Sequence, residues 1–89
     1  MNIDEIIKLS INDYNKSKRK FNMTDDDQVE IIGPKSKLDS LATVELLSCI
    51  EQIYFKYKKE KIDLVNKIFS SENEVLTLKN LKEILKNDF

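Results

Sequence analysis

One serine in this chain is placed for chemistry, because it stands between an aspartate and a leucine at Asp39-Ser40-Leu41. Asp and Ser both accept hydrogen bonds from the unpaired N–H groups of a helix start, so the pair predicts a helix that begins here. Ser40 would then lie in the first turn with its hydroxyl toward solvent. A phosphate ester there would meet free N–H groups and the positive end of the helix dipole, which stabilise an added anion by about 0.3 to 1 kcal/mol. The residue types therefore suit Ser40 to carry a phosphodiester.

Other chemistry finds little support in the residue types. The chain has no His, so Ser40 lacks the usual activating base of a hydrolase, and no Gly-x-Ser-x-Gly elbow is present. Cys49 is the only cysteine, which excludes an intramolecular disulfide and a zinc site; we expect it to be a small core residue. The acids at 25–27 lack the alternation and central Gly of a calcium loop. We therefore predict no catalytic residue, no metal site and no enzyme activity.

The helix that must position Ser40 is predicted to run to about Tyr57 and carries two apolar lines. One line would face the core: Leu46, Leu47, Ile50, Ile53 and Tyr54. The other would stay partly exposed: Leu41, Val44 and Ser48.

Three further helices are predicted around this one. A first amphipathic helix is expected from Asn2 to about Lys20, where Asn2 and Glu5 have the spacing of a capping box. A short helix is expected over 62–69, and Thr77 should cap a last helix. Residues 70–75 are predicted as a turn. The last helix has apolar residues at helical spacing: Leu78, Leu81, Ile84 and Leu85.

Residues 21–38 are predicted as a long loop, because helical periodicity is lost and Gly33-Pro34 would stop a helix. A loop of this length exceeds the usual connection and should be pinned by its own apolar side chains. Those side chains are Phe21, Met23, Val29, Ile31 and Ile32.

Length and composition predict one all-α domain over residues 1–89. A chain of 89 residues can fill one core, and a single Gly and a single Pro leave little material for hairpin turns. The acidic start of the chain is unlike a secretory signal, and no apolar run approaches the roughly 20 residues of a membrane span. The expected protein is therefore a cytoplasmic monomer that does not insert into membranes.

The formal net charge of −1 provides no overall basic field, so no nucleic-acid partner is predicted. The charges nevertheless occur in blocks. Two blocks are basic, one at 16–20 and one formed by Lys56, Lys58, Lys59 and Lys61. We interpret them as solvated faces first, and only second as a surface for nucleic acid or anionic lipid.

Residues 38–47, Leu-Asp-Ser-Leu-Ala-Thr-Val-Glu-Leu-Leu, closely resemble the prosthetic-group site of acyl carrier proteins. The resemblance covers most of the chain; it is sharpest over 38–54, moderate over 77–85, and one of pattern alone over 1–36. It implies an acyl-carrier-like four-helix bundle of three longer helices and a short third one. It also implies that Ser40 carries a covalent 4′-phosphopantetheine arm, whose thiol presents acyl or aminoacyl groups as thioesters.

The same resemblance implies partners and the residues that meet them. A phosphopantetheinyl transferase (holo-carrier synthase) would attach the arm, and acyl-loading and acyl-transfer enzymes would use it. Asp39 has two open roles, as a helix cap or as an aid to the transferase through a metal bound with coenzyme A. Leu41, Val44 and Glu45 match positions that dock into apolar grooves with basic rims, with an ordinary surface role as the alternative for these three. Glu51 would extend the acidic edge.

Several positions depart from the housekeeping carriers of fatty acid biosynthesis. Ala42 and Gln52 replace usual acids, Ser48 replaces an apolar residue, and the net charge is close to zero. The block that begins at Lys56 is also unusually basic. These departures favour a dedicated carrier in a lipid, polyketide or surface-glycan pathway. The main alternative is a helical interaction module with a carrier-like fold that is never modified.

Overall fold

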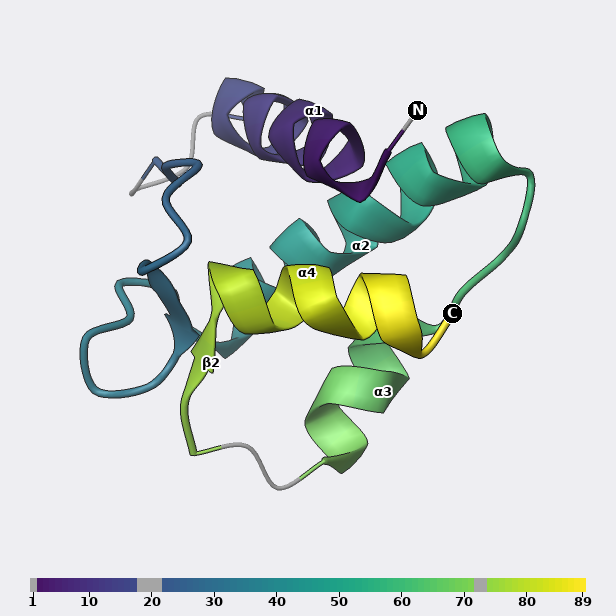
Figure 1. Ribbon diagram of the computed structural model, residues 1–89. Coiled ribbons are helices and arrows are strands. Elements are labelled where there is room, and N and C mark those ends of the chain that lie inside the picture. The colour runs from purple at the N-terminus through teal and green to yellow at the C-terminus, as the bar shows by residue number, and fades with distance from the viewer. Residues whose placement is uncertain (1, 18–21, 72–73) are drawn as a thin grey trace.

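The computed structural model describes residues 2–17, 22–71 and 74–89. Within them the chain forms four α-helices and one two-stranded antiparallel sheet (Figure 1). A mostly helical chain with a short third helix is thereby confirmed. The elements are, in order, α1 (Ile3–Lys16), β1 (Glu30–Ile32), α2 (Ser40–Lys58), α3 (Leu64–Ser70), β2 (Leu76–Thr77) and α4 (Leu78–Asn87).

Helix α1 begins where the sequence predicted, because the Asn2 side chain accepts a hydrogen bond from the Glu5 N–H at 2.8 Å. The helix ends at Lys16, before the predicted end near Lys20. Residues 18–20, and with them most of the first basic block, lie outside the described residues, as does Phe21. Helix α1 contacts both α2 and α4, and its buried face forms one wall of the core.

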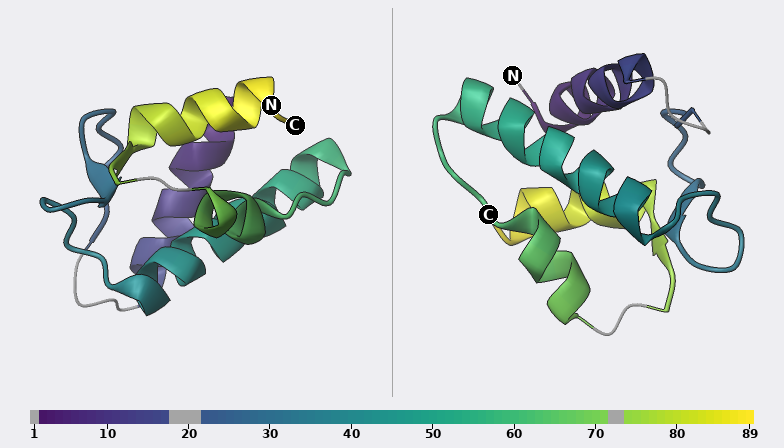
Figure 2. Two further views of the ribbon diagram at one scale, coloured as in Figure 1. Left: turned by 90° about the horizontal axis from the view of Figure 1, so that it is seen from below. Right: turned by 180° about the vertical axis from the view of Figure 1, so that it is seen from behind.

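Helix α2 is the longest element and crosses the whole molecule (Figures 1 and 2). It is capped by Asp39 at its start and ends at Lys58, and the C-cap residue Lys59 adopts a left-handed conformation with φ of 60°. Of the predicted core line, all members are buried except Ile53, which is partly buried. Cys49 is also only partly buried and packs against the core, so the prediction that it is a core residue is confirmed only in part.

All four helices contribute apolar side chains to one continuous core. The loop between α1 and α2 adds Met23 and Ile31, which are both buried. The Asn15 side chain holds this loop in place by donating to the Met23 carbonyl at 2.9 Å and accepting from the Met23 N–H at 2.8 Å. The prediction that the loop is pinned by its own apolar residues is confirmed at these two positions.

The sheet corrects the description of residues 21–38 as a loop without strands. β1 pairs with β2 antiparallel near the start of α2, with Glu30 opposite Thr77 and Ile32 opposite Leu76 (Figures 1 and 2). β-Branched side chains favour extended backbone, and burial of Ile31 anchors the strand on the core. The pairing also brings the start of α4 to the long loop, where the Leu78 N–H donates to the Val29 carbonyl at 2.9 Å.

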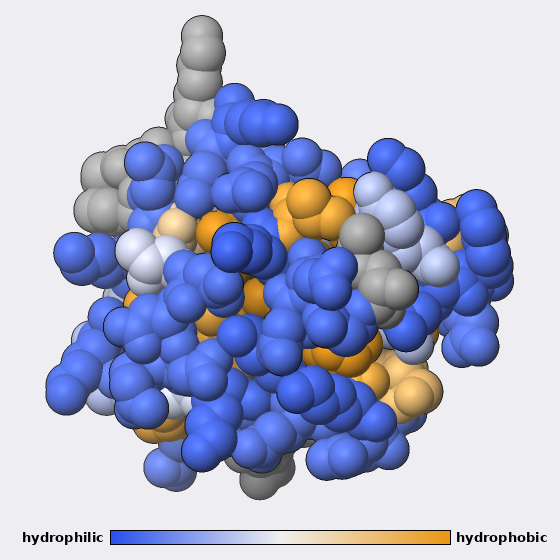
Figure 3. Space-filling view, turned by 45° about the horizontal axis from the view of Figure 1, so that its top comes forward, coloured by the Kyte–Doolittle hydropathy of each residue, from blue (hydrophilic) through white to orange (hydrophobic). Residues whose placement is uncertain are grey.

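None of the helices in the described ranges combines the length and the apolar character needed to cross a bilayer. The face of the molecule shown in Figure 3 is mostly hydrophilic, and its apolar side chains gather in separate patches.

Candidate functional site

Ser40 is the first residue of α2, and its side chain is exposed. Asp39 precedes it as the N-cap, because its carboxylate accepts a hydrogen bond from the Ala42 N–H at 2.7 Å. The Asp39 carbonyl accepts from both the N–H and the hydroxyl of Thr43, each at 2.9 Å. Among the described residues, none forms a hydrogen bond with the Ser40 hydroxyl. The capping function is thus carried by Asp39, and the Ser40 oxygen remains available.

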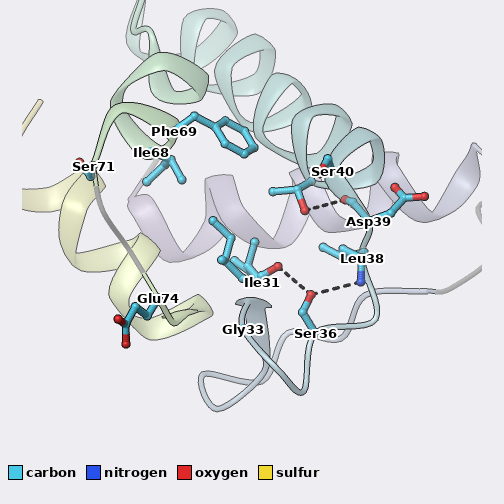
Figure 4. Close-up of a pocket in the computed structure, with 12 residues that line it drawn as sticks. Ile31, Gly33, Ser36, Leu38, Asp39, Ser40, Ile68, Phe69, Ser71 and Glu74 are labelled. Carbon is cyan, nitrogen blue, oxygen red and sulfur yellow. Dashed lines mark hydrogen bonds between the residues drawn. The ribbon is translucent and has the colours of Figure 1, made fainter.

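The segment before Ser40 is a folded turn. The Ser36 hydroxyl donates to the Ile31 carbonyl at 2.7 Å and accepts from the Leu38 N–H at 3.1 Å (Figure 4). Gly33 has φ of 144°, a conformation that side chains rarely permit, and a Cβ atom there would collide with the Glu30 carboxylate. These contacts fix how the chain enters α2 and therefore where Ser40 lies.

A groove of about 490 Å³ lies beside Ser40, between the start of α2, the end of α3 and the turn after β1 (Figure 4). Its walls are mixed in character. The apolar part is formed by Ile31, Ile32, Leu38, Ile68 and Phe69. The polar part is formed by Ser36, Asp39, Ser40, Thr43, Ser71 and Glu74, and Gly33 completes the lining.

The predicted partner-facing residues share one side of α2 but differ in exposure. Leu41 is the most exposed, at 69%, and it adjoins Ser40. Val44 and Glu45 are partly buried. Glu51 is also partly buried, and its carboxylate accepts a hydrogen bond from the Val65 N–H at 3.0 Å. Glu51 therefore has a structural contact with α3 that the sequence did not reveal.

The sequence identified the start of α2 but missed the opposite wall of the groove. Ile68 and Phe69 come from α3, almost thirty residues later in the chain, and nothing in their local pattern links them to Ser40. Phe69 is large and apolar yet 48% exposed, and this exposure, known only from the structure, marks it as a candidate site residue. Ser36 and Thr43 were also missed, because their hydrogen bonds depend on how the turn folds.

Within the described ranges, no three side chains of the Cys, Asp and Glu types are grouped to hold a metal ion. Comparisons of the chain with protein-family models, curated proteins and solved structures found no match.

Proposed function

We propose that this protein is a free-standing acyl carrier protein whose Ser40 is the attachment point of a 4′-phosphopantetheine arm. The observation that carries the proposal is the Ser40 hydroxyl, which is exposed, without a hydrogen-bond partner among the described residues, and placed at the start of a capped helix. The resemblance of residues 38–47 to the carrier motif supports the same assignment.

The surroundings of Ser40 fit such an arm chemically. The first N–H groups of a helix lack intrahelical acceptors, so those of Ser40 and Leu41 face a position that favours a phosphodiester anion. The adjoining groove offers apolar walls for the methyl and methylene groups of the arm and hydroxyl groups for its two amides. The order of helices, with a long α2 and a short α3, is compatible with an acyl-carrier-like bundle.

The division of tasks follows from these positions. The arm, once attached, supplies the thiol that holds an acyl or aminoacyl group as a thioester. Ser40 holds the arm, Asp39 fixes the helix start, and the groove shields one side of the attachment point. The protein itself is not an enzyme in this proposal. Its place is the cytoplasm, in a specialised lipid, polyketide or surface-glycan pathway.

The proposed partners are a phosphopantetheinyl transferase and the enzymes that load and unload the arm. Leu41 would lead their docking, because it is exposed and next to the attachment point, with Val44 and Glu45 beside it on the same side of α2. The exposed Leu41 also suits the alternative function, an unmodified interaction module that binds a protein through α2.

Intact mass separates these two functions. The purified protein is weighed before and after incubation with coenzyme A and a broad-specificity phosphopantetheinyl transferase. We expect one added phosphopantetheine, mapped to Ser40, and no addition to Ser40→Ala. Ser71→Ala is the matched control, because Ser71 lines the same groove and is exposed. An unmodified wild type with an active transferase would favour the interaction module, and an arm on Ser40→Ala would refute the site.

A further inference from the structure

The opposite end of α2 carries a second unusual surface, which is unrelated to the groove. Residues 55–61 are all exposed, and we call them the basic tip. The last turn of α2 projects beyond the other helices (Figures 1 and 2). The tip holds four lysines against one acid, Glu60; the lysines are Lys56, Lys58, Lys59 and Lys61.

Two aromatic rings lie among these lysines. Phe55 is 47% exposed and Tyr57 is 41% exposed. The Lys56 Nζ atom lies 5.4 Å from the centre of the Tyr57 ring, and the Lys61 Nζ atom lies 6.0 Å from the centre of the Phe55 ring. Each ring is therefore paired with an ammonium group at cation–π distance. Positive charge and apolar area occur together on one small surface.

The tip continues into a neighbouring hollow of about 410 Å³ between the ends of α2 and α4 and the start of α1. Lys58 and Glu60 line this hollow from the tip, and Lys86 and Phe89 line it from the C-terminal side. Lys86 is also paired with Asp4 at 3.8 Å, so its charge is partly compensated. The hollow therefore adds little uncompensated positive charge, and the basic surface is formed by the last turn of α2 and the residues directly after it.

Helix stability accounts for only part of this surface. Lysines in the last turn of α2 complement the helix dipole, which explains Lys56 and Lys58. It does not explain Lys61, which lies beyond the helix, nor does it explain two large exposed rings. Exposed aromatic rings surrounded by lysines are the combination that binds the headgroup region of a membrane, where rings enter the boundary and ammonium groups meet phosphates.

The position of the tip also separates it from the candidate site. Ser40 and Lys58 are at the two ends of a helix of 19 residues, which corresponds to about 27 Å along its axis. The Ser40 end carries exposed charges of both signs, the acids Asp39 and Glu74 and the lysines Lys35 and Lys37. An anionic surface would therefore attract the tip more strongly than the opposite end and would orient the molecule with Ser40 facing away.

We infer that the basic tip docks this protein on an anionic lipid surface, as a peripheral contact without insertion of a helix. Nucleic acid is the less suitable partner, because the overall net charge of −1 gives no wider basic field for a polyanion to follow. The inference is independent of the arm on Ser40.

Vesicle co-sedimentation of the unmodified full chain tests this inference. We expect binding to vesicles of equal parts phosphatidylcholine and phosphatidylserine, weak binding to phosphatidylcholine alone, and loss of binding as salt is raised. Removal of two tip charges in Lys56→Gln/Lys58→Gln should weaken binding roughly 30-fold. Phe55→Ser should weaken binding in a salt-independent way, because it removes apolar contact and no charge.

The matched control is Lys35→Gln/Lys37→Gln, which makes the same change in net charge at the Ser40 end of α2. This variant should bind as the wild type does. Equal losses in both double variants, or no preference for phosphatidylserine, would overturn the inference. A mixed-sequence oligonucleotide is tested in parallel. If the oligonucleotide binds more tightly than the vesicles, and its binding depends on the tip lysines, the partner is nucleic acid and the inference is overturned.

Discussion

Asp39 and Ser40 are neighbours with separable roles. The Asp39 carboxylate caps α2, whereas the Ser40 hydroxyl forms no hydrogen bond with any described residue. The two roles left open for Asp39 can therefore be distinguished by a substitution that removes the charge of its side chain and keeps its shape. An Asn side chain still caps a helix but lacks the charge that would help to hold a metal bound with coenzyme A.

We expect Asp39→Asn to unfold at nearly the wild-type denaturant concentration and yet to accept the phosphopantetheine arm at least tenfold more slowly. Asp39→Ala should show the same slow transfer and also lose about 1 kcal/mol of stability, because the cap is gone. The measurements are urea unfolding and the rate of mass gain with transferase and coenzyme A.

Asp63→Ala is the control for this pair, because Asp63 caps α3 in the same way, through the Asn66 N–H at 3.1 Å. It should lose stability and keep the normal rate of arm transfer. If Asp39→Asn is modified as fast as the wild type, Asp39 serves only as a cap.

At this scale the sequence predicts what is local. Asp39 and Ser40 could be placed because a helix cap depends on residues within one turn of each other. Phe69 could not be placed beside them, because its approach depends on how α3 packs against α2. The same holds for Glu51, which has the pattern of a surface acid and contacts the start of α3 instead.

At the scale of elements, Glu51 connects α2 to a helix that is too short to be stable alone. Its carboxylate accepts a hydrogen bond from the Val65 N–H in the first turn of α3, where the helix dipole favours negative charge. We expect Glu51→Ala to cost about 1 to 2 kcal/mol and to speed amide hydrogen exchange in α3 more than in α1. Glu51→Gln keeps an acceptor and should cost less.

Gln52→Ala is the control for Glu51, since Gln52 is the exposed next residue on the same helix. It should leave the exchange of α3 unchanged. Equal exchange rates in Glu51→Ala and the wild type would show that the hydrogen bond does not hold α3.

The turn between β1 and α2 depends on a glycine. Gly33→Ala should lower the free energy of unfolding by about 1 to 3 kcal/mol, because φ of 144° is strained for any side chain. Collision with the Glu30 carboxylate should add little, because that carboxylate is the end of a flexible side chain and can move aside. The loss should therefore be nearly the same in a Glu30→Ala background, where only the backbone strain remains. Urea unfolding of the four proteins in this cycle measures both parts, and an undiminished stability of Gly33→Ala would contradict the turn geometry.

The sheet shows why strands that pair over a long sequence separation could not be predicted from the sequence. β2 has two residues, and its partner Glu30–Ile32 lies more than forty positions earlier. Neither segment is long enough to show an alternating pattern, so only their meeting reveals them as strands. The four helices, by contrast, each show their own apolar spacing and caps, and all four were predicted within a few residues.

At the scale of the whole molecule, Lys82 joins three parts of the chain. Its ammonium group on α4 lies 2.8 Å from Asp27 and 3.4 Å from Asp25 on the long loop, and 3.8 Å from Asp4 on α1. The Lys82 side chain is largely covered, which strengthens pairing relative to a fully solvated lysine. We expect Lys82→Met to lower the Tm by several degrees at neutral pH. Lys86→Met is the control, because Lys86 is half exposed, its ion pair among the described residues is with Asp4, and its charge acts on Asp27 less than that of Lys82 does.

The pH dependence of this effect has a definite direction. The hydrogen bond from Lys82 holds the pKa of Asp27 below its ordinary value, so the folded state binds its proton less readily than the unfolded state. The stabilisation is therefore present above the unfolded pKa of about 4 and fades as pH falls through the lower folded value. The same hydrogen bond raises the pKa of Lys82, so at the alkaline end the stabilisation is lost only as pH rises through that raised value.

Thermal unfolding of wild type, Lys82→Met and Lys86→Met across pH tests this assignment. The gap between wild type and Lys82→Met should be constant from pH 5 to pH 9 and should close in acid, as Asp27 takes up its proton. The gap for Lys86→Met should be small throughout, because its pairing is solvent-exposed and screened. A Lys82→Met deficit that persists unchanged in strong acid would mean that the lysine stabilises the fold by packing of its methylene chain against the loop and not by its charge.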